Sequence, residues 1–540
     1  MKKTLAVLLA ALFCAVWVLG CGQSGNTPAK ESTAASSETQ TEGTKATETT
    51  KETEAETTVE TSKEEDTSES EVDPKDVYKA RFILCVVNDN WPHQDLVNEH
   101  VAEISRRDLK DVEIEIVPLS FSAMLNQIPL MMAANEQIDV YWSSATDDHY
   151  EQGYCVDLMQ YKDILQPAIT LLGEEDIMAS RHQGRLLCLP PQTERTHSVG
   201  MAMRTDILKE CGFDPETING AGVDAAFEKA EEIYKAVHEK YPDMRVIAGK
   251  KATALPCFTY SADSLGDGYG VLDNYGETFD VVNLYETEFY KKAVSYMKKW
   301  FDLGYVQRDL AVSEDNYESQ VKSGAAFGGF GPMKPDSDAE KRDQCAHEMT
   351  IFHFTKEMLG AYGGGSGYTI GGTSKDYEKA AKALNYCFTS GEFNDTINWG
   401  VEGEDWVEIA ENVAAYPEGM NNENRTYHNA YGWLYPNQRV GHVWEGNRAN
   451  IYTEIYPEAE KNAIRSCAYG FLFDKTDYLD TIGALNNIKD EYNSMIGSGG
   501  IDDVDGKIKE FCDRLYGSGL QTVMDAKQEQ LNAWREANGK

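Results

Sequence analysis

The chain has 540 residues, a formal net charge of −40 and aromatic side chains at 10% of its positions. Such a negative charge repels nucleic acid and anionic membrane surfaces, so it argues against either as the partner. Residues 75–540 are too many for one compact core, and at least two lobes are expected.

The N-terminus, MKKTLAVLLAALFCAVWVLGC, has two lysines followed by an apolar run from Leu5 to Leu19. This run is too short for a membrane-spanning helix and precedes a polar stretch, so residues 1–21 indicate an export signal. Its ending, Val18 to Cys21, resembles the bacterial lipobox. The mature protein would then start at Cys21 and be anchored through a lipid on that residue. An ordinary secretory signal with an incidental cysteine is the alternative.

Residues 22–74 are rich in Thr, Glu, Ser, Lys and Ala and contain no aromatic residue. A segment of this composition cannot bury enough apolar surface to offset the entropy lost on ordering. We therefore expect a disordered acidic tether between the anchor and the folded part.

Strand and helix patterns alternate in the next part of the chain. The sequence predicts strands at 81–87, 112–119 and 138–145, a helix at 93–107, and a helix at 120–136 that is interrupted at a proline. Alternating strands and helices form largely parallel sheets, whose loops meet at the carboxyl edge where ligands bind.

A second lobe is predicted after the segment HQGRLLCLPP, with the crossing near residues 191–198. A new strand and helix follow, then amphipathic helices at 226–241 and 289–306 and a glycine-rich strand at 324–332. The strand and helix of 367–390 are assigned back to the first lobe, and three amphipathic helices close the chain.

The cysteines of the body are isolated, odd in number and without a C-x-x-C pair. We interpret them as small buried hydrophobes and not as a disulfide frame or a zinc site. A single disulfide between two of these cysteines remains an open alternative.

The order of these motifs resembles the extracellular solute-binding lipoproteins of bacterial sugar ABC importers, in particular their LipO-like branch. The resemblance covers nearly the whole chain. It rests on the lipobox and tether, on GRLLCLP at the crossing, and on the segments WGVEGEDW and GFLFD with the terminal Gln528, Gln530 and Trp534. The YPNQ segment departs from the Gly-Asn pair common in the family.

The resemblance implies an α/β, two-lobed, periplasmic-binding-protein-like fold of type II, in which helices flank a mostly parallel sheet in each lobe. Extra helices would close the C-terminus. We expect lobe 1 to comprise 75–191 and 360–410, and lobe 2 to comprise 192–359 and 411–540. Such a protein binds a solute between its lobes and delivers it to a permease, and hinge closure is its working step.

Sugars present apolar C–H faces and hydroxyl edges, so their sites need flat aromatic rings and planar hydrogen-bonding groups. We expect the platforms to be Trp91, Trp142 and Trp399, which lie at strand or helix ends. Second-lobe candidates are Tyr260 and Phe330, and a further candidate is Trp433. For each ring the alternative is ordinary core or rim packing.

Charged and amide side chains near the predicted loops could orient a sugar. The guanidinium of Arg195 could donate hydrogen bonds to two adjacent hydroxyls, or it could form an ion pair with Glu194 or another acid. Glu402 could accept hydroxyl hydrogen bonds, or it could serve a turn after a helix that ends at Gly400. The full set of polar candidates is Asn88, Asp89, Asp147, Arg195, Asp263 and Glu402.

The acidic turn of Glu402, Glu404 and Asp405 also suggests a glycosidase pair. Glycosidases need two opposed carboxylates roughly 5–10 Å apart, usually from different strand ends and not from one turn. The sequence has no P-loop, no G-x-S-x-G and no H-E-x-x-H motif. We therefore expect no catalytic residue, no cofactor and no metal.

Taken together, the sequence predicts a monomeric, lipid-anchored binding protein on the outer face of a bacterial cell membrane. Its partners would be a carbohydrate, preferably an oligosaccharide, and the transmembrane subunits of an ABC permease. Two rivals stay open: a secreted carbohydrate-active enzyme, and a receptor for peptides or cationic solutes.

Overall fold

The computed structural model describes residues 76–540, apart from residues 89, 145–146, 182–183, 252–260, 361–365 and 433. The predicted signal segment, Cys21 and the acidic tether lie outside the described residues.

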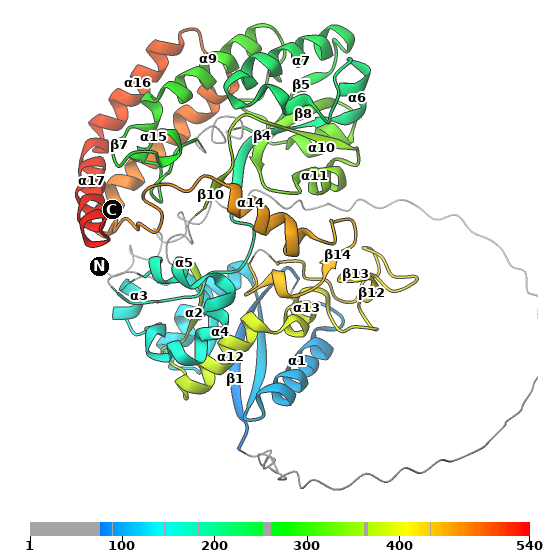
Figure 1. Cartoon of the computed structure of the whole chain (residues 1–540), viewed down its shortest axis with the longest axis vertical. Helices are drawn as coiled ribbons and strands as arrows, with labels where there is room; N and C mark the ends of the chain where they lie inside the picture. Colours follow the sequence, from blue (N-terminus) through cyan, green and yellow to red (C-terminus); the bar gives the residue numbers. More distant parts are fainter. Residues whose placement is uncertain are drawn as a thin grey trace, which may run out of the picture. The chain divides into compact units, whose positions relative to one another are not determined.

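The first sheet has the strand order β11-β3-β1-β2. β1 (Tyr78–Val86) is parallel to β2 (Val112–Ser120) and β3 (Val140–Ser144), whereas β11 (Ser366–Ile370) runs antiparallel to β3. Figure 1 shows β1 with the helices of the first lobe beside it. The parallel strands confirm the pattern predicted from alternating strands and helices. The pairing of β11 with β3 places residues 366–370 in the first sheet.

Both faces of β1 are buried, as its continuous apolar run indicates. Phe82 and Leu84 pack with α1 (Gln94–Leu109), α12 (Tyr377–Thr389) and α13 (Gly391–Trp399), which cover one face of the sheet. Ile83 and Cys85 pack with α2 (Phe121–Ala133) on the other face.

Pro129 lies inside α2, so the predicted interruption of this helix is wrong. A proline lacks one backbone N–H, but here the helix continues past it to Ala133.

The second sheet has β4 (Thr196–Arg204) at its centre. β4 pairs antiparallel with β8 (Ala326–Met333), β9 (Met349–His353) and β10 (Met358–Leu359), while β5 (Arg245–Ile247) is parallel to β8. The expectation of a mostly parallel sheet in each lobe is therefore wrong for the second lobe. A strand buried on both faces has the same apolar pattern in either orientation, so the sequence does not reveal its direction.

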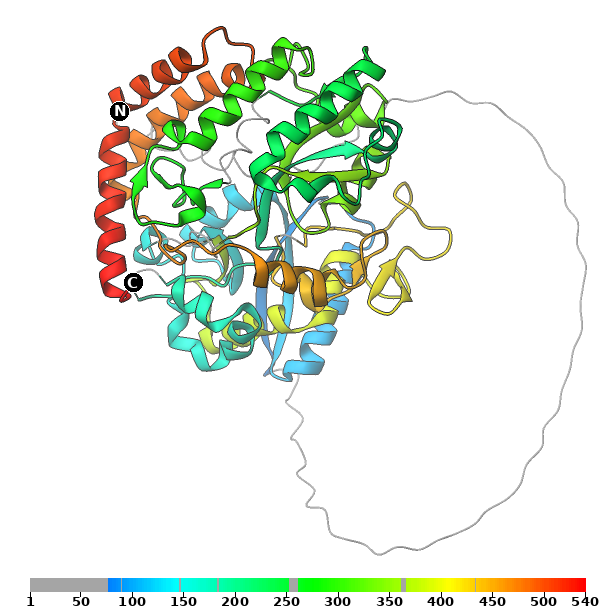
Figure 2. The same cartoon turned by 45° about the horizontal axis from the view of Figure 1, so that its top comes forward.

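The core of the second sheet is built from aromatic and aliphatic side chains on α7 (Ala226–Lys240), α9 (Glu288–Asp302) and the strands. Figure 2 shows the ribbons of these two helices beside the sheet. Trp300 of α9 is fully buried, and Phe330 of β8 stacks on it with ring centroids 6.3 Å apart. Phe354 packs against both rings.

The three predicted C-terminal helices are present as α15 (Leu479–Ser498), α16 (Val504–Gly517) and α17 (Leu520–Ala537). Most of their apolar residues form one core together with Val294 and Tyr290 of α9, whereas Leu531 and Trp534 of α17 pack with Phe471. Met495 of α15 is 36% exposed.

Part of the segment assigned to lobe 2 belongs to the first sheet. Tyr427 and Tyr435 are fully buried in the core that contains β1. The side chain of Asn429 accepts a hydrogen bond from Val87 N (2.8 Å) and donates one to Cys85 O (3.2 Å), directly at the end of β1. The boundary that placed all of 411–540 in lobe 2 is therefore corrected for this segment.

A small sheet in the order β12-β13-β14 is formed by residues on either side of this segment. Its strands are β12 (Val407–Ala410), β13 (Val413–Ala415) and β14 (Val443–Trp444). The shorter elements elsewhere are α3 (Asp147–Glu151), α4 (Lys162–Leu172), α5 (Glu174–Ala179), α6 (Thr205–Glu210), α10 (Tyr317–Lys322), α11 (Ser337–Cys345), α14 (Tyr456–Asn462), β6 (Val271–Leu272) and β7 (Val281–Val282).

Across the described part of the chain, no helix has the length and apolar character needed to cross a bilayer.

Candidate ligand-binding cavity

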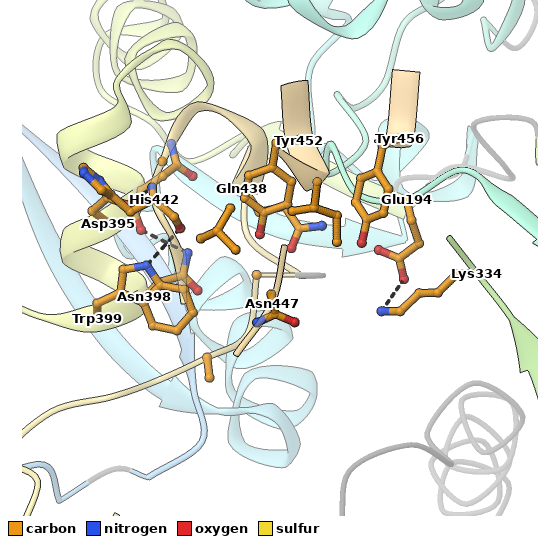
Figure 3. Close-up of a pocket in the computed structure, with 16 residues that line it drawn as sticks. Glu194, Lys334, Asp395, Asn398, Trp399, Gln438, His442, Asn447, Tyr452 and Tyr456 are labelled. Carbon is orange, nitrogen blue, oxygen red and sulfur yellow. Dashed lines mark hydrogen bonds and ion pairs between the residues drawn. The ribbon is translucent and has the colours of Figure 1, made fainter. Parts of the chain in front are cut away.

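A cavity of about 200 Å³ lies between the end of α13 and two residues that flank the second sheet (Figure 3). Glu194 precedes β4 and Lys334 follows β8, while the remaining wall comes from α13 and the chain between 430 and 456. The lining residues are Glu194, Lys334, Asn394, Asp395, Asn398, Trp399, Ala430, Gly432, Gln438, Gly441, His442, Val443, Asn447, Ile451, Tyr452 and Tyr456.

Trp399 is the last residue of α13 and forms part of the cavity wall. The helix ends there because Gly400 adopts a φ of 100°, a left-handed conformation that suits glycine. A Cβ at Gly400 would also collide with the Asp405 carboxylate. The indole Nε1 donates to His442 O at 3.4 Å, which helps to hold the ring in place.

Other aromatic rings support Trp399. His428 and Trp444 lie with their ring centroids 5.0 Å and 4.9 Å from it, and Tyr416 packs against both of them. Burial, with a smaller contribution from Arg425, lowers the pKa of His428 to about 3. His428 is therefore neutral near pH 7 and acts as a packing partner.

Asn398 is 3% exposed and presents an unused acceptor in this wall. Its Nδ2 donates to Asn394 O at 3.0 Å, whereas its Oδ1 is buried and has no hydrogen-bond partner among the described residues. A buried acceptor without a partner is destabilising by roughly 1–3 kcal/mol. A ligand donor at this point would remove that penalty.

The charged groups at one end of the cavity are paired with each other. Lys334 Nζ lies 3.2 Å from the carboxylates of both Glu194 and Glu340. Burial lowers the pKa of Lys334, but the two carboxylates outweigh this effect and hold it above its ordinary value. Lys334 is therefore charged, and the two carboxylates already balance its charge.

The charged groups at the other end are also paired. Asp395 accepts hydrogen bonds from His442 N (2.6 Å) and lies 2.7 Å from His442 Nδ1. The hydrogen bond to Asp395 is the main reason that the pKa of His442 is raised. Gly441 permits this contact, because a Cβ there would collide with the Asp395 carboxylate.

Neutral polar groups of the same wall are left uncommitted. The hydroxyls of Tyr452 and Tyr456 and the amide of Gln438 make no hydrogen bond within the described residues. Burial raises the pKa of both tyrosines, so both hydroxyls stay protonated. Figure 3 shows the two tyrosines side by side between the charged pairs. The cavity therefore offers a ligand neutral hydrogen-bonding groups and, in the same wall, an indole ring.

Of the three predicted tryptophan platforms, the structure places Trp399 in the cavity wall. Trp91 is 9% exposed and packs against Tyr427 at 5.7 Å. Trp142 is half-buried on β3 and packs against Phe121 at 6.1 Å. The expected convergence of three indoles on one gap is therefore not found. A strand-end position does not tell whether a ring faces the edge of the sheet or its core.

Phe330, predicted as a second-lobe platform, is instead a core residue that is 4% exposed and stacked on Trp300. Tyr260 and Trp433 lie outside the described residues, as does Asp89.

Arg195 makes an ion pair with an acid, which is the alternative that the sequence left open. It forms an ion pair with Asp176 at 2.8 Å and contacts the Tyr469 hydroxyl. Its neighbour Glu194, the partner first considered, pairs with Lys334 at the cavity.

The remaining polar candidates lie apart from the cavity wall. Asn88 Oδ1 accepts a bond from Asn90 N at 3.0 Å, and Asp263 Oδ1 accepts one from Leu265 N at 3.0 Å. Asp147 begins α3, but its side chain is not described. Glu402 is exposed on the turn that follows α13.

The acidic turn after Trp399 is a structural element centred on Asp405. This carboxylate is fully buried and accepts hydrogen bonds from Val401 N (2.9 Å) and Thr426 Oγ1 (2.6 Å). It also lies 2.7 Å from His93 Nδ1, which ties the turn to the start of α1. Glu402 and Glu404 point outward from the same turn and are exposed.

Several cavity residues were missed by sequence reasoning, among them Asn398, His442, Gln438, Tyr452 and Tyr456. One signal was available, because Asn394, Asp395 and Asn398 recur at helical spacing on an otherwise buried helix. The other residues come from irregular chain and show no such pattern.

Two family models match the chain. Residues 106–403 match bacterial extracellular solute-binding proteins, and residues 467–536 match a domain of unknown function (DUF3502). A curated relative is the carbohydrate ABC transporter substrate-binding protein of Streptococcus pneumoniae serotype 4. It is 23% identical over 434 residues, which are 78% of this chain and 84% of the relative.

Solved structures share the fold. The N-glycan transport solute-binding protein NgtS of Streptococcus pneumoniae has a TM-score of 0.70 at 21% identity, covering 86% of this chain and 100% of NgtS. An HMO-binding, ABC-transporter-associated solute-binding protein of Bifidobacterium longum infantis has a TM-score of 0.57 at 15% identity, covering 85% of this chain and 99% of that protein. With a family model that spans residues 106–403 and a shared fold over most of its length, this chain belongs to the family of bacterial extracellular solute-binding proteins.

Proposed function

We propose that the protein is the substrate-binding component of a carbohydrate ABC importer, and that it delivers an oligosaccharide to the permease subunits. The observation that carries the proposal is that the charged groups of the cavity are paired, whereas several of its neutral polar groups make no hydrogen bond within the described residues. The charged groups form the pairs Glu194–Lys334 and Asp395–His442, whereas the uncommitted groups are neutral and belong to the same cavity wall as Trp399. An indole face and neutral hydrogen-bonding groups are what a sugar ring requires.

The size of the cavity supports an oligosaccharide that extends beyond it. Small-molecule pockets commonly measure about 300–1000 Å³, and this cavity measures about 200 Å³. One ring of a glycan would occupy it while the remaining rings lie outside. The relatives agree with this ligand class, since NgtS structures contain Man1GlcNAc and Man5GlcNAc.

The pairing of charges also weighs against the rival classes. A receptor for cationic solutes needs carboxylates with no cationic partner, but Glu194 and Asp395 each have one. A glycosidase needs two opposed carboxylates, but Asp405 holds a turn together and Glu402 and Glu404 are exposed.

A thermal-shift panel with Man1GlcNAc, Man5GlcNAc, an oligopeptide mixture and spermine tests the ligand class. We expect a glycan to raise the melting temperature, because a ligand at a hundred times its Kd adds about 2.7 kcal/mol of stability. A response to spermine or peptides alone would contradict the proposal. Assay of the same mixtures for new reducing ends should find none, and their release would favour an enzyme.

We also propose that the protein is held at the outer face of the cell membrane by a lipid on Cys21. The lipobox-like ending of the N-terminal segment supports this. In a bacterial host, the wild-type protein should fractionate with membranes and Cys21→Ser should be released. Equal membrane retention of both proteins would contradict the anchor.

A further inference from the structure

Asn398 has features that set it apart from the other amides of the cavity. It lies one turn from Asn394 on α13, and both side chains are buried in the same wall. Asn394 uses its whole amide on the protein: Nδ2 donates to Cys387 O and Ser390 O, and Oδ1 accepts from Asn437 N. Asn398 uses only its Nδ2.

The orientation of the Asn398 amide is fixed by its surroundings. Asn394 O can only accept a hydrogen bond, so the Asn398 atom that faces it at 3.0 Å must be the nitrogen. The oxygen is then the atom left over. The backbone is held as well, because Asn398 O accepts from Asn429 N (2.7 Å) and Ala430 N (3.3 Å).

This fixed acceptor imposes a demand on the ligand. In the empty cavity Asn398 Oδ1 is shielded from water and has no hydrogen-bond partner among the described residues. A ring with a hydroxyl or amide N–H at the right position would then satisfy Oδ1, whereas a ring without a donor would leave it buried and unpaired. Recognition sites built on a buried polar group reject ligands that lack the matching group.

We propose that Asn398 is the specificity-determining acceptor of the cavity, which selects the sugar ring carrying a hydrogen-bond donor opposite Oδ1. The proposal rests on the proposed function, since it assumes that a glycan occupies this cavity. It assigns a role to a side-chain oxygen that has no hydrogen-bond partner among the described residues.

The experiment combines one protein change with changes in the ligand. Binding of Man1GlcNAc, or of the tightest glycan in the panel, and of its complete set of monodeoxy derivatives is measured by calorimetry. The proteins are the wild type, Asn398→Leu and Asn385→Leu. Asn385 is the matched control, because its Oδ1 accepts a structural bond from Ala168 N (3.0 Å) on α4.

We expect one monodeoxy derivative to bind the wild type and Asn385→Leu about tenfold to a hundredfold more weakly than the parent glycan. In Asn398→Leu the difference for that derivative should shrink to less than about twofold. Since the first readout uses the wild type alone, it holds even if Asn398→Leu fails to fold.

Two results would overturn parts of the account, and they can be told apart. If the wild type binds the parent glycan but no single deoxygenation weakens binding by tenfold, or if the same penalty persists in Asn398→Leu, Asn398 is not the selecting acceptor. If the wild type binds no glycan of the panel, the proposed function itself is wrong.

Discussion

Two halves of one short segment, NWGVEGEDW, have different tasks. Asn398 and Trp399 end α13 and form part of the cavity wall, whereas Asp405 and Trp406 are buried and hold the turn that follows. Trp406 Nε1 donates to Gly400 O at 3.0 Å, and Asp405 caps Val401 N. Asn398 and Trp399 thus form a binding half of the segment, and Asp405 and Trp406 form a structural half that supports it. Although these acids and indoles are close in sequence, they do not form one site.

The comparison is tested most strongly by Asp405→Ala. Loss of this buried carboxylate leaves Val401 N, Thr426 and His93 without their acceptor, so the free energy of unfolding should fall by roughly 3 kcal/mol. Urea unfolding measures the loss. Glycan affinity per folded molecule should stay within about twofold, and a selective loss of affinity at unchanged stability would assign Asp405 to the binding half.

Trp399→Leu should produce the opposite result. Removal of the indole face should weaken glycan binding by about 2 kcal/mol, or roughly thirtyfold in Kd. Trp142→Leu is the matched control, because Trp142 was an equal candidate from sequence but packs against Phe121. Calorimetry below both melting temperatures compares them, and an equal loss for the two variants would refute the assignment of Trp399 to the site.

A smaller effect is expected from pH. The pKa of His442 is raised above its ordinary 6.5, first by its hydrogen bond to Asp395 and further by Glu408. The stabilisation by this pair is therefore fully present below about pH 6.5 and is lost as the pH rises through the raised pKa. Urea unfolding of the wild type and His442→Gln across this range should show their difference shrinking with rising pH, and a constant difference would contradict the pairing.

The smallest effect is expected from the double variant Glu402→Gln and Glu404→Gln. Both side chains are exposed on the turn, and exposed substitutions usually change stability by less than about 0.5 kcal/mol. Stability and glycan affinity should therefore match the wild type in unfolding and calorimetric titrations. A tenfold loss of affinity would move the ligand toward the acidic turn.

Much of the fold could be predicted from local patterns. The alternation of apolar runs predicted β1, β2 and β3 with their helices, and amphipathic spacing predicted α7, α9 and the three C-terminal helices. These features depend on periodicity within one element, which a single sequence displays directly.

Apart from the interruption predicted at Pro129, the features that failed depend on contacts between distant residues. The direction of the strands beside β4 and the attachment of Tyr427 and Asn429 to the end of β1 leave no local pattern. The same holds for the site. Trp91, Trp142 and Trp399 are equivalent by position, and only packing shows which ring has a cavity beside it.

The structure of the protein in complex with the tightest glycan of the panel tests the central claim most directly. The account predicts an intact oligosaccharide with one ring on Trp399 and a hydroxyl or amide N–H donating to Asn398 Oδ1. A cleaved sugar, or an intact one bound elsewhere with the cavity between Glu194 and Asp395 left open, would contradict it.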